Sequence, residues 1–123
     1  MAQRVAVLGA SPKRDRYSNQ AIRLLGDYGH EVIPVNPREQ EIEGLSVIHD
    51  ISEIDGKIDS LTVYLNPKIS SKMAQEIVSL NPGRVILNPG AESPDLEKAL
   101  DENGIKYLHA CTLVMLRTDQ FDI

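Results

Sequence analysis

The sequence contains only one cysteine and no long apolar run, and each scarcity removes a class of protein. A lone Cys111 cannot form an internal disulfide, which excludes a small secreted scaffold held together by disulfides. No stretch approaches the roughly 20 consecutive apolar residues that a membrane-spanning helix needs. The opening residues, Met1 to Arg4, lead directly into a strand-like segment without the profile of a signal peptide. We therefore expect a cytoplasmic protein that does not associate with a membrane.

An excess of basic charge is also lacking. The formal net charge is −5 and the pI of the sequence is about 5.1, which argues against an open basic face for nucleic acid. The three histidines and the single cysteine show no spacing typical of metal ligands, so no metal site is expected. A length of 123 residues suits one hydrophobic core, and we expect a single domain over residues 1–123.

What the sequence does contain is a regular alternation of two patterns. Short, nearly continuous apolar runs are typical of strands buried on both faces of a parallel sheet. Five such runs lie at Arg4–Leu8, Glu31–Val35, Leu61–Leu65, Arg84–Leu87 and Lys106–Ala110. Segments with helical spacing separate most of them and end before Gly29, Pro82 and Gly104, and Ser93-Pro94 is a good helix start. The link from Pro37 to Ile58 is irregular, with room for a minor strand at Val47-Ile48 and a helical turn at Ile51–Ile54.

This alternation predicts an α/β fold, namely a Rossmann-like, doubly wound parallel sheet of about five strands in a three-layer α/β/α arrangement. If the chain reverses direction after the third strand, the strand order is 3-2-1-4-5. Ligands of such sheets bind at the carboxyl ends of the strands, where the order reverses. Candidate functional residues are therefore those that follow each strand.

The loop after the first strand has the features of a phosphate-binding turn. It reads Gly9-Ala10-Ser11-Pro12-Lys13, and the next helix is expected to open near Ser18. Glycine lets the backbone approach a ligand, and the free N–H groups of a helix start favour an anion. Lys13, Arg14 and Arg16 add positive charge. The alternative is a tight turn with a solvated charged rim, in which Ser18 is only a helix cap.

Two features of a dinucleotide site are missing. The loop departs from the G-x-G-x-x-G pattern, and the second strand ends in Val35-Asn36-Pro37-Arg38 without an acidic partner for a ribose hydroxyl. A cation at Arg38 instead suits an adenosine that carries an additional phosphate. An NAD(P)-binding redox sensor or oxidoreductase domain is thus the weaker alternative.

An Asn-Pro pair follows three of the five expected strands, as Asn36-Pro37, Asn66-Pro67 and Asn88-Pro89. Proline fixes φ and favours an extended conformation of the preceding residue, so each pair makes a stiff strand exit with an amide at its rim. Any single pair is best interpreted as the start of a helix. Three pairs at one edge of a sheet indicate a shaped ligand slot.

The ordered set of these motifs resembles the small stand-alone CoA-binding domain proteins, which are related to the N-terminal domain of the succinyl-CoA synthetase alpha subunit. The resemblance spans nearly the whole chain and rests on the segments Val5–Pro12, Val32–Pro37, Tyr64–Pro67, Asn88–Glu92 and Cys111–Leu116. It implies that coenzyme A or an acyl-CoA is the ligand. By this similarity Gly9, Ala10, Ser11 and Lys13 hold cofactor phosphate, while Asn36, Pro37 and Arg38 flank the adenosine. Leu65, Asn66, Pro67, Asn88, Pro89 and Gly90 line the path of the pantetheine arm.

The synthetase carries its phosphorylated histidine in a second domain that has no counterpart in this sequence, so its reaction cannot be transferred. We assign no catalytic residue and expect a binding protein rather than an enzyme. His109 and Cys111 are two residues apart, which makes an imidazole-activated thiolate conceivable, but a small buried Cys111 is the stronger interpretation. A mixed disulfide of Cys111 with CoA is a further hypothesis.

The sequence does not determine the oligomeric state. The apolar tail segment Thr112–Leu116 suits either packing over the edge of the sheet or the interface of a homodimer. A subunit that supplies its CoA site to a larger acyl-CoA ligase complex is another alternative.

Overall fold

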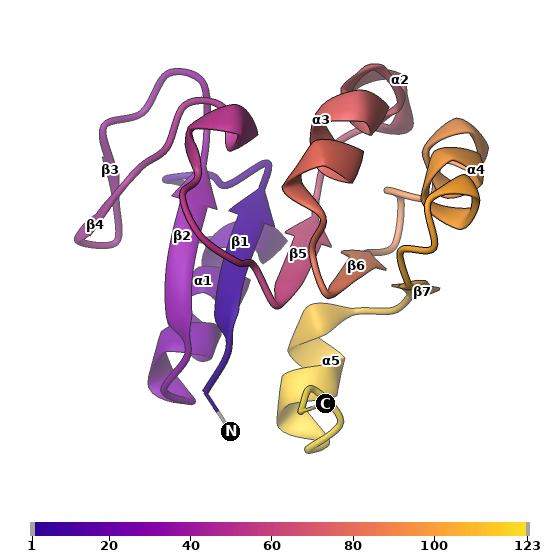
Figure 1. Cartoon of the computed structure of the whole chain (residues 1–123). Coiled ribbons are helices and arrows are strands. Elements are labelled where there is room, and N and C mark those ends of the chain that lie inside the picture. Colours follow the sequence, from indigo (N-terminus) through magenta and orange to yellow (C-terminus); the bar gives the residue numbers. More distant parts are fainter. Residues whose placement is uncertain (1, 123) are drawn as a thin grey trace.

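In the computed structural model, which describes residues 2–122, five parallel strands form the central sheet (Figure 1). They are β1 (Arg4–Leu8), β2 (Glu31–Val35), β5 (Ser60–Val63), β6 (Arg84–Leu87) and β7 (Tyr107–His109). The prediction of about five parallel strands is confirmed, and three of them have the predicted bounds. The third strand begins one residue earlier than expected and ends at Val63, because the chain leaves the sheet at Tyr64 toward the Asn66-Pro67 helix start.

The strand order corrects the expected 3-2-1-4-5. The sheet runs β2-β1-β5-β6-β7, so the third strand in the chain pairs with the first strand and not with the second. Asp59 fixes this pairing, since its side chain accepts a hydrogen bond from the Arg4 N–H at 2.8 Å and its own N–H donates to the Arg4 carbonyl. Next to the outer strand β2 lies the link instead, where Ile48 bridges to Val35. The order therefore reverses between β1 and β5, which places the switch point at the Gly9 turn.

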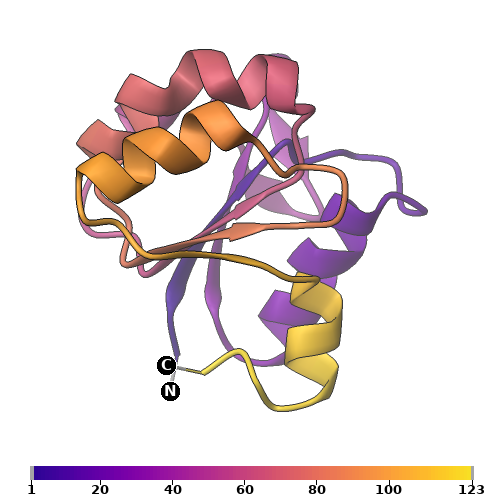
Figure 2. The same ribbon diagram turned by 90° about the vertical axis from the view of Figure 1, so that its right-hand side faces the viewer.

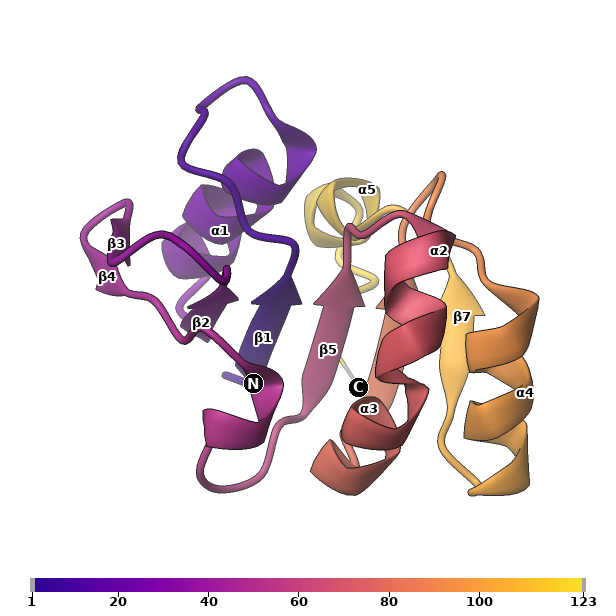
Figure 3. The same ribbon diagram turned by 90° about the horizontal axis from the view of Figure 1, so that it is seen from above.

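Helices cover both faces of the sheet (Figure 3). One face carries α1 (Tyr17–Asp27) and α5 (Thr112–Arg117), and the other carries α3 (Ala74–Leu80) and α4 (Pro94–Glu102). The helical pattern before Pro82 is split into α2 (Pro67–Ser70), a 3₁₀ turn η2 (Ser71–Met73) and α3. The irregular link forms a hairpin of β3 (Glu41–Ile42) and β4 (Leu45–Ser46) and the helical turn η1 (Ile51–Glu53).

Each central strand is buried on both faces, as its continuous apolar run predicts. Ala6 and Leu8 of β1 pack into the core beneath α3 and α4, whereas Val5 and Val7 pack into the core beneath α1 and α5. Gly29 and Gly104 end α1 and α4 with positive φ angles of 87° and 67°, which confirms their expected role.

The apolar tail segment packs within its own chain. Figure 2 shows α5 beside α1, and Leu113, Met115 and Leu116 are buried there. The segment after α5 returns to the start of the sheet, where the Phe121 carbonyl accepts hydrogen bonds from the side chains of Gln3 (3.1 Å) and Arg84. Within residues 2–122 no helix is long and apolar enough to cross a membrane, and no cluster of three or more His, Cys, Asp or Glu residues could hold a metal ion.

Candidate functional site

The turn after β1 brings two strand ends unusually close together. Gly9 has a φ of +90°, and a Cβ at this position would lie 3.0 Å from Leu65 Cδ2 and 3.2 Å from the Tyr64 carbonyl carbon. Any side chain here would strain the backbone and collide with the exit of β5. A substitution of Gly9 would therefore test folding as much as binding.

The Gly9 turn opens onto a cavity of about 280 Å³, which we call the Gly9 cavity. Its walls come from the turn itself, the start of α1, the exit of β5 and the loop after β6. They are formed by Gly9, Ser11, Arg16, Tyr17, Ser18, Tyr64, Leu65, Asn66, Pro89, Gly90 and Ala91. The volume of this cavity leaves room for an anion beside the turn.

The start of α1 leaves its N–H groups available to this cavity. The N-cap residue is Arg16, whose side chain makes no capping hydrogen bond, and the first turn holds no acidic residue. Ser18 is therefore not the helix cap, since it lies within the first turn, although the charged rim of that alternative is present in the exposed Lys13 and Arg14. Tyr17 and Ser18 of that turn line the cavity. Uncapped N–H groups and the helix dipole make this a favourable position for an anion.

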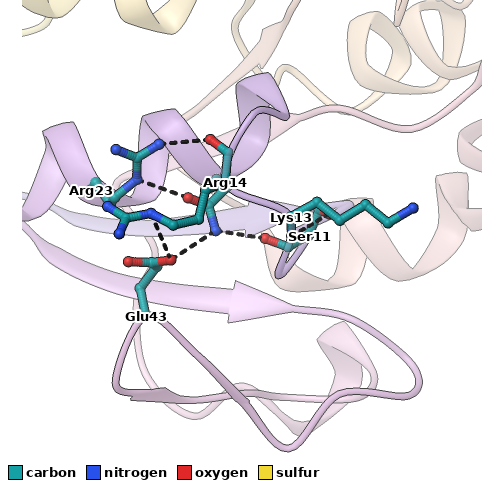
Figure 4. A network of polar contacts seen from close by, with 6 residues as sticks. Ser11, Lys13, Arg14, Arg23 and Glu43 are labelled. Atoms are coloured by element: carbon teal, nitrogen blue, oxygen red, sulfur yellow. Dashed lines mark hydrogen bonds and ion pairs between the residues drawn. The ribbon is translucent and has the colours of Figure 1, made fainter.

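A polar network ties the loop to α1 and to the β3–β4 hairpin (Figure 4). The fully buried Asn19 donates from Nδ2 to the Ser11 carbonyl (2.9 Å) and to Glu43 of the hairpin (3.2 Å). Its Oδ1 accepts from Arg23 Nε at 2.8 Å, and Arg23 donates to the Arg14 carbonyl at 2.7 Å. This network was not predicted from the sequence. A signal was present, because Asn19 is a polar residue among the apolar positions of its helix.

The cations of the loop differ in their placement. Arg14 lies 3.8 Å from Glu43, and Lys13 is exposed and points away from the network in Figure 4. Arg16 is the one that lines the Gly9 cavity, whereas the side chain of Lys13 is not part of its wall. Arg16 is thus better placed than Lys13 to meet an anion at the helix start.

The three Asn-Pro asparagines shape the rim with bonds to their own chain. Asn36 donates to the Ala10 carbonyl at 2.8 Å and accepts from the N–H groups of Arg38 and Glu39, which ties the end of β2 to the end of β1. Asn66 caps α2 by accepting from the Lys68 N–H at 2.8 Å. The hydrogen bonds of these side chains fix the position of the chain where it leaves β2 and β5.

Asn88 is buried and also forms its hydrogen bonds within the chain. Its Nδ2 donates to the Thr62 hydroxyl (2.7 Å) and the Val63 carbonyl (2.9 Å), and its Oδ1 accepts from the Thr112 N–H at 2.9 Å. One amide thereby joins β5, β6 and the start of α5. Its polar atoms are engaged within the chain.

Two further cavities adjoin the Gly9 cavity, one on each side. The Pro37 cavity, of about 240 Å³, is lined by Leu8, Gly9, Val35, Pro37, His49, Asp50, Ile51, Leu65, Ile69 and Met73. The Cys111 cavity, of about 300 Å³, is lined by Tyr17, Tyr64, Asn88, Pro89, Cys111, Leu113, Val114 and Arg117. Gly9 and Leu65 belong to both the Pro37 and Gly9 cavities, and Tyr17, Tyr64 and Pro89 to both the Gly9 and Cys111 cavities. The three cavities form a continuous row along the carboxyl edge of the sheet.

Most of the predicted site residues border this row. Lining residues are Gly9, Ser11, Ser18, Pro37, Leu65, Asn66, Asn88, Pro89 and Gly90. The walls of the three cavities do not include Ala10, Pro12, Lys13, Asn36, Arg38 and Pro67. Ala10 turns inward, since its N–H donates to the Val35 carbonyl and its own carbonyl accepts from Asn36.

Exposed apolar side chains gather around the same row. Tyr17, Ile69 and Val114 are 71%, 52% and 54% exposed and are among the four large apolar residues that stand out at the surface of residues 2–122. Each lines one or more of the three cavities. Exposed apolar surface that collects around cavities is typical of a binding site.

Two ionisable side chains at the cavities are held in defined states. Hydrogen bonds from the N–H and the hydroxyl of Ser52 hold the pKa of Asp50 below its usual value. Burial raises the pKa of Tyr64 to about 12, and its oxygen has no hydrogen-bond partner within residues 2–122. The hydroxyls of Thr62 and Thr112 partly oppose this shift, but they hydrogen-bond each other at 2.8 Å. Tyr64 is therefore a neutral phenol at physiological pH.

His109 and Cys111 contact different faces of the sheet. His109 Nε2 lies 3.0 Å from Glu97 Oε1 on α4, on one face of the sheet. Cys111 is the N-cap residue of α5 on the opposite face and lines the Cys111 cavity, where it is half-buried. The imidazole is thus engaged with a carboxylate away from the thiol.

Comparisons with known proteins agree with this architecture. A family model described as a CoA binding domain matches residues 3–117. The uncharacterized protein YneT of Bacillus subtilis is 30% identical over 119 residues, which cover 90% of this chain and 88% of YneT. A solved crystal structure of an uncharacterized protein superposes with a TM-score of 0.91 at 40% identity and covers 98% of this chain and 99% of that one. The alpha subunit of an ADP-forming acetate–CoA ligase II of Pyrococcus furiosus is 35% identical over 65 residues, 52% of this chain but 14% of that subunit.

Proposed function

The chain belongs to the CoA-binding domain family, and from this membership we propose that it binds coenzyme A or an acyl-CoA in the row of three cavities, without a catalytic step of its own. One observation carries the proposal most directly. The uncapped start of α1 faces a cavity of about 280 Å³ at the Gly9 turn, and Arg16 stands at its wall. This is the arrangement that a diphosphate requires.

The order of the cavities fits the order of the groups in the ligand. The diphosphate of CoA occupies the middle of the molecule and would lie in the Gly9 cavity. The adenosine would lie in the Pro37 cavity, beside the ends of β1 and β2, with the exposed Arg38 next to Pro37 to meet the additional phosphate on the ribose. The pantetheine arm would then leave past Asn66, Pro89 and Gly90.

The polar groups of the Gly9 cavity support binding rather than catalysis. Ser11, Arg16 and the first-turn N–H groups of α1 are hydrogen-bond donors to an anion. Tyr64 is held protonated, and His109 is paired with Glu97 on the other face. The site thus resembles an anion cradle without a general base positioned beside a nucleophile.

One observation favours the NAD(P) alternative. The link brings Asp50 to the Pro37 cavity, so an acidic residue lies near the predicted adenosine although none follows β2 in the sequence. Its Oδ1 accepts hydrogen bonds from the N–H and hydroxyl of Ser52, which leaves Oδ2 as the oxygen for a ribose hydroxyl. The CoA proposal has the stronger support because the family model of a CoA binding domain matches residues 3–117.

Calorimetry of the purified chain tests both candidates. CoA and acetyl-CoA are expected to bind more tightly than NAD, NADP or ATP, and adenosine 3′,5′-bisphosphate is expected to bind more weakly than CoA because it lacks the pantetheine arm. Binding of NAD or NADP with no binding of CoA would overturn the proposal.

The partial match to a ligase alpha subunit also favours a role as the CoA site of a larger ligase complex. Co-purification of a nucleotide-binding partner chain with this protein would support that role.

A further inference from the structure

The Cys111 cavity differs in chemistry from the cavity beside it. Its walls are largely apolar and include the buried Leu113, the exposed Val114 and the rings of Tyr17 and Tyr64. Both N–H donors of the Asn88 amide are used by Thr62 and Val63, and its oxygen already accepts from Thr112. Among residues 2–122, Arg117 is the one charged residue of the wall, so most of the cavity suits an apolar ligand group.

The position of the cavity selects the end of the ligand that reaches it. It shares Tyr17, Tyr64 and Pro89 with the Gly9 cavity, on the side opposite the Pro37 cavity. If the diphosphate lies at α1 and the adenosine lies in the Pro37 cavity, the Cys111 cavity is the neighbouring cavity left for the other end of the ligand, which would reach it past Pro89. The amides of the pantetheine arm prefer polar surroundings, whereas an acyl chain on the sulfur gains free energy in an apolar chamber.

We propose that the Cys111 cavity is an acyl chamber and that the preferred ligand is a CoA thioester of a short aliphatic acid. The inference rests on the proposed CoA function, since it assumes the diphosphate position. Exposed Val114 forms the outer wall of the chamber, and Cys111 lies at the start of α5 along its inner rim.

The first test is a series of ligands that differ only in acyl length. Calorimetric affinity is expected to rise from acetyl-CoA to propionyl-CoA to butyryl-CoA by about fourfold for each methylene that the chamber buries. Affinities that are equal along the series, or that fall with chain length, would overturn the acyl chamber.

The second test uses the only thiol of the chain as a local reporter. Butyryl-CoA has no free thiol and does not consume an alkylating reagent, so the rate of Cys111 alkylation by N-ethylmaleimide reports on access to the chamber. Saturating butyryl-CoA is expected to slow the reaction at least about tenfold, as a ligand that buries the thiol must. Adenosine 3′,5′-bisphosphate, which ends before the pantetheine arm, is expected to leave the rate unchanged. Equal rates with and without bound butyryl-CoA would place the acyl group elsewhere.

A pair of variants separates the chamber from the opposite end of the row. Val114→Phe adds bulk at an exposed wall of the chamber, so it is expected to abolish the difference between acetyl-CoA and butyryl-CoA. Ile69→Phe is a matched change at a similarly exposed residue of the Pro37 cavity and is expected to shift both affinities by the same factor. A chain-length preference that survives in Val114→Phe and is lost in Ile69→Phe would reverse the assignment.

The two levels of the proposal fail in different ways. If no CoA compound binds, the proposed function is wrong. If CoA and its thioesters bind with one affinity and leave Cys111 reactive, the CoA site stands and the acyl chamber is wrong.

Discussion

Two helices begin at the same edge of the sheet and complete their first turns in opposite ways. At α4 the Ser93 hydroxyl accepts from the Leu96 N–H at 3.3 Å, and Glu97 accepts from the Ser93 N–H at 3.0 Å. Asp95 and Glu97 add negative charge at the positive end of the helix dipole. The start of α1 has neither a capping side chain nor an acidic residue, and it faces a cavity.

The comparison separates stability from binding within one architecture. Ser93 caps α4 from within the chain, so this start contributes to folding. The start of α1 has no side-chain cap, which costs some helix stability and leaves its N–H groups for the proposed anion. Changes at the two starts should therefore act on different measurements.

The largest effect on CoA affinity is expected when a negative charge is placed in the uncapped first turn of α1. Tyr17→Asp places a carboxylate in the first turn of α1, where it should stabilise the helix but repel a diphosphate. CoA affinity is expected to fall about 50-fold relative to Tyr17→Asn, as for two charges a few ångströms apart near a protein surface. Both variants lose the ring, so their comparison isolates charge. Equal dissociation constants in calorimetry would mean that the phosphates bind elsewhere.

Removing the Arg16 cation at the start of α1 should have the next largest effect on CoA affinity. Arg16→Ala is expected to weaken CoA binding about tenfold, because a charge-assisted hydrogen bond to phosphate is lost. Lys13→Ala removes a cation that does not line the cavity and is expected to change affinity less than about twofold. A larger loss in Lys13→Ala than in Arg16→Ala would support Lys13 as the phosphate ligand, as the family resemblance implies.

Removing the side-chain cap of α4 should lower the stability of the fold without changing CoA binding. Ser93→Ala removes the cap of α4 and is expected to lower the free energy of unfolding by about 1 kcal/mol in urea titration. The affinity for CoA should stay unchanged, since Ser93 does not line the three cavities. A loss of affinity without a loss of stability would contradict the division between the two helix starts.

The smallest effect is expected at Glu97. Glu97→Gln keeps an acceptor for the Ser93 N–H but loses the charge that faces the helix dipole and His109. The free energy of unfolding is expected to fall by about 0.5 kcal/mol. Urea titrations of the two proteins measure the difference, and an unchanged free energy of unfolding would exclude a contribution from this carboxylate.

Local signals in the sequence account well for the fold. The double burial of Val5 to Leu8, the helix ends at Gly29 and Gly104 and the cap at Ser93 all depend on neighbouring residues and were predictable. The strand order was not, because the pairing of Arg4 with Asp59 joins residues far apart in the chain. The short Asp50 segment likewise reaches the Pro37 cavity only through the tertiary fold.

The candidate site was predictable as a region but less so in its individual atoms. The motifs locate the Gly9 turn and the strand exits, and Gly9, Ser11 and Leu65 line the cavities as expected. The family resemblance implied Lys13 as a phosphate ligand, yet Arg16 is the cation that lines the Gly9 cavity, and this placement depends on the tertiary arrangement of the loop. The amides of Asn36 and Asn88 looked available for a ligand because their partners lie on other strands.

The bond between Gln3 and the Phe121 carbonyl brings the first and last parts of the fold together at the amino edge of the sheet. The cavities lie at the carboxyl edge. Further polypeptide joined at the amino edge would leave the cavities uncovered, because they lie at the opposite edge of the sheet.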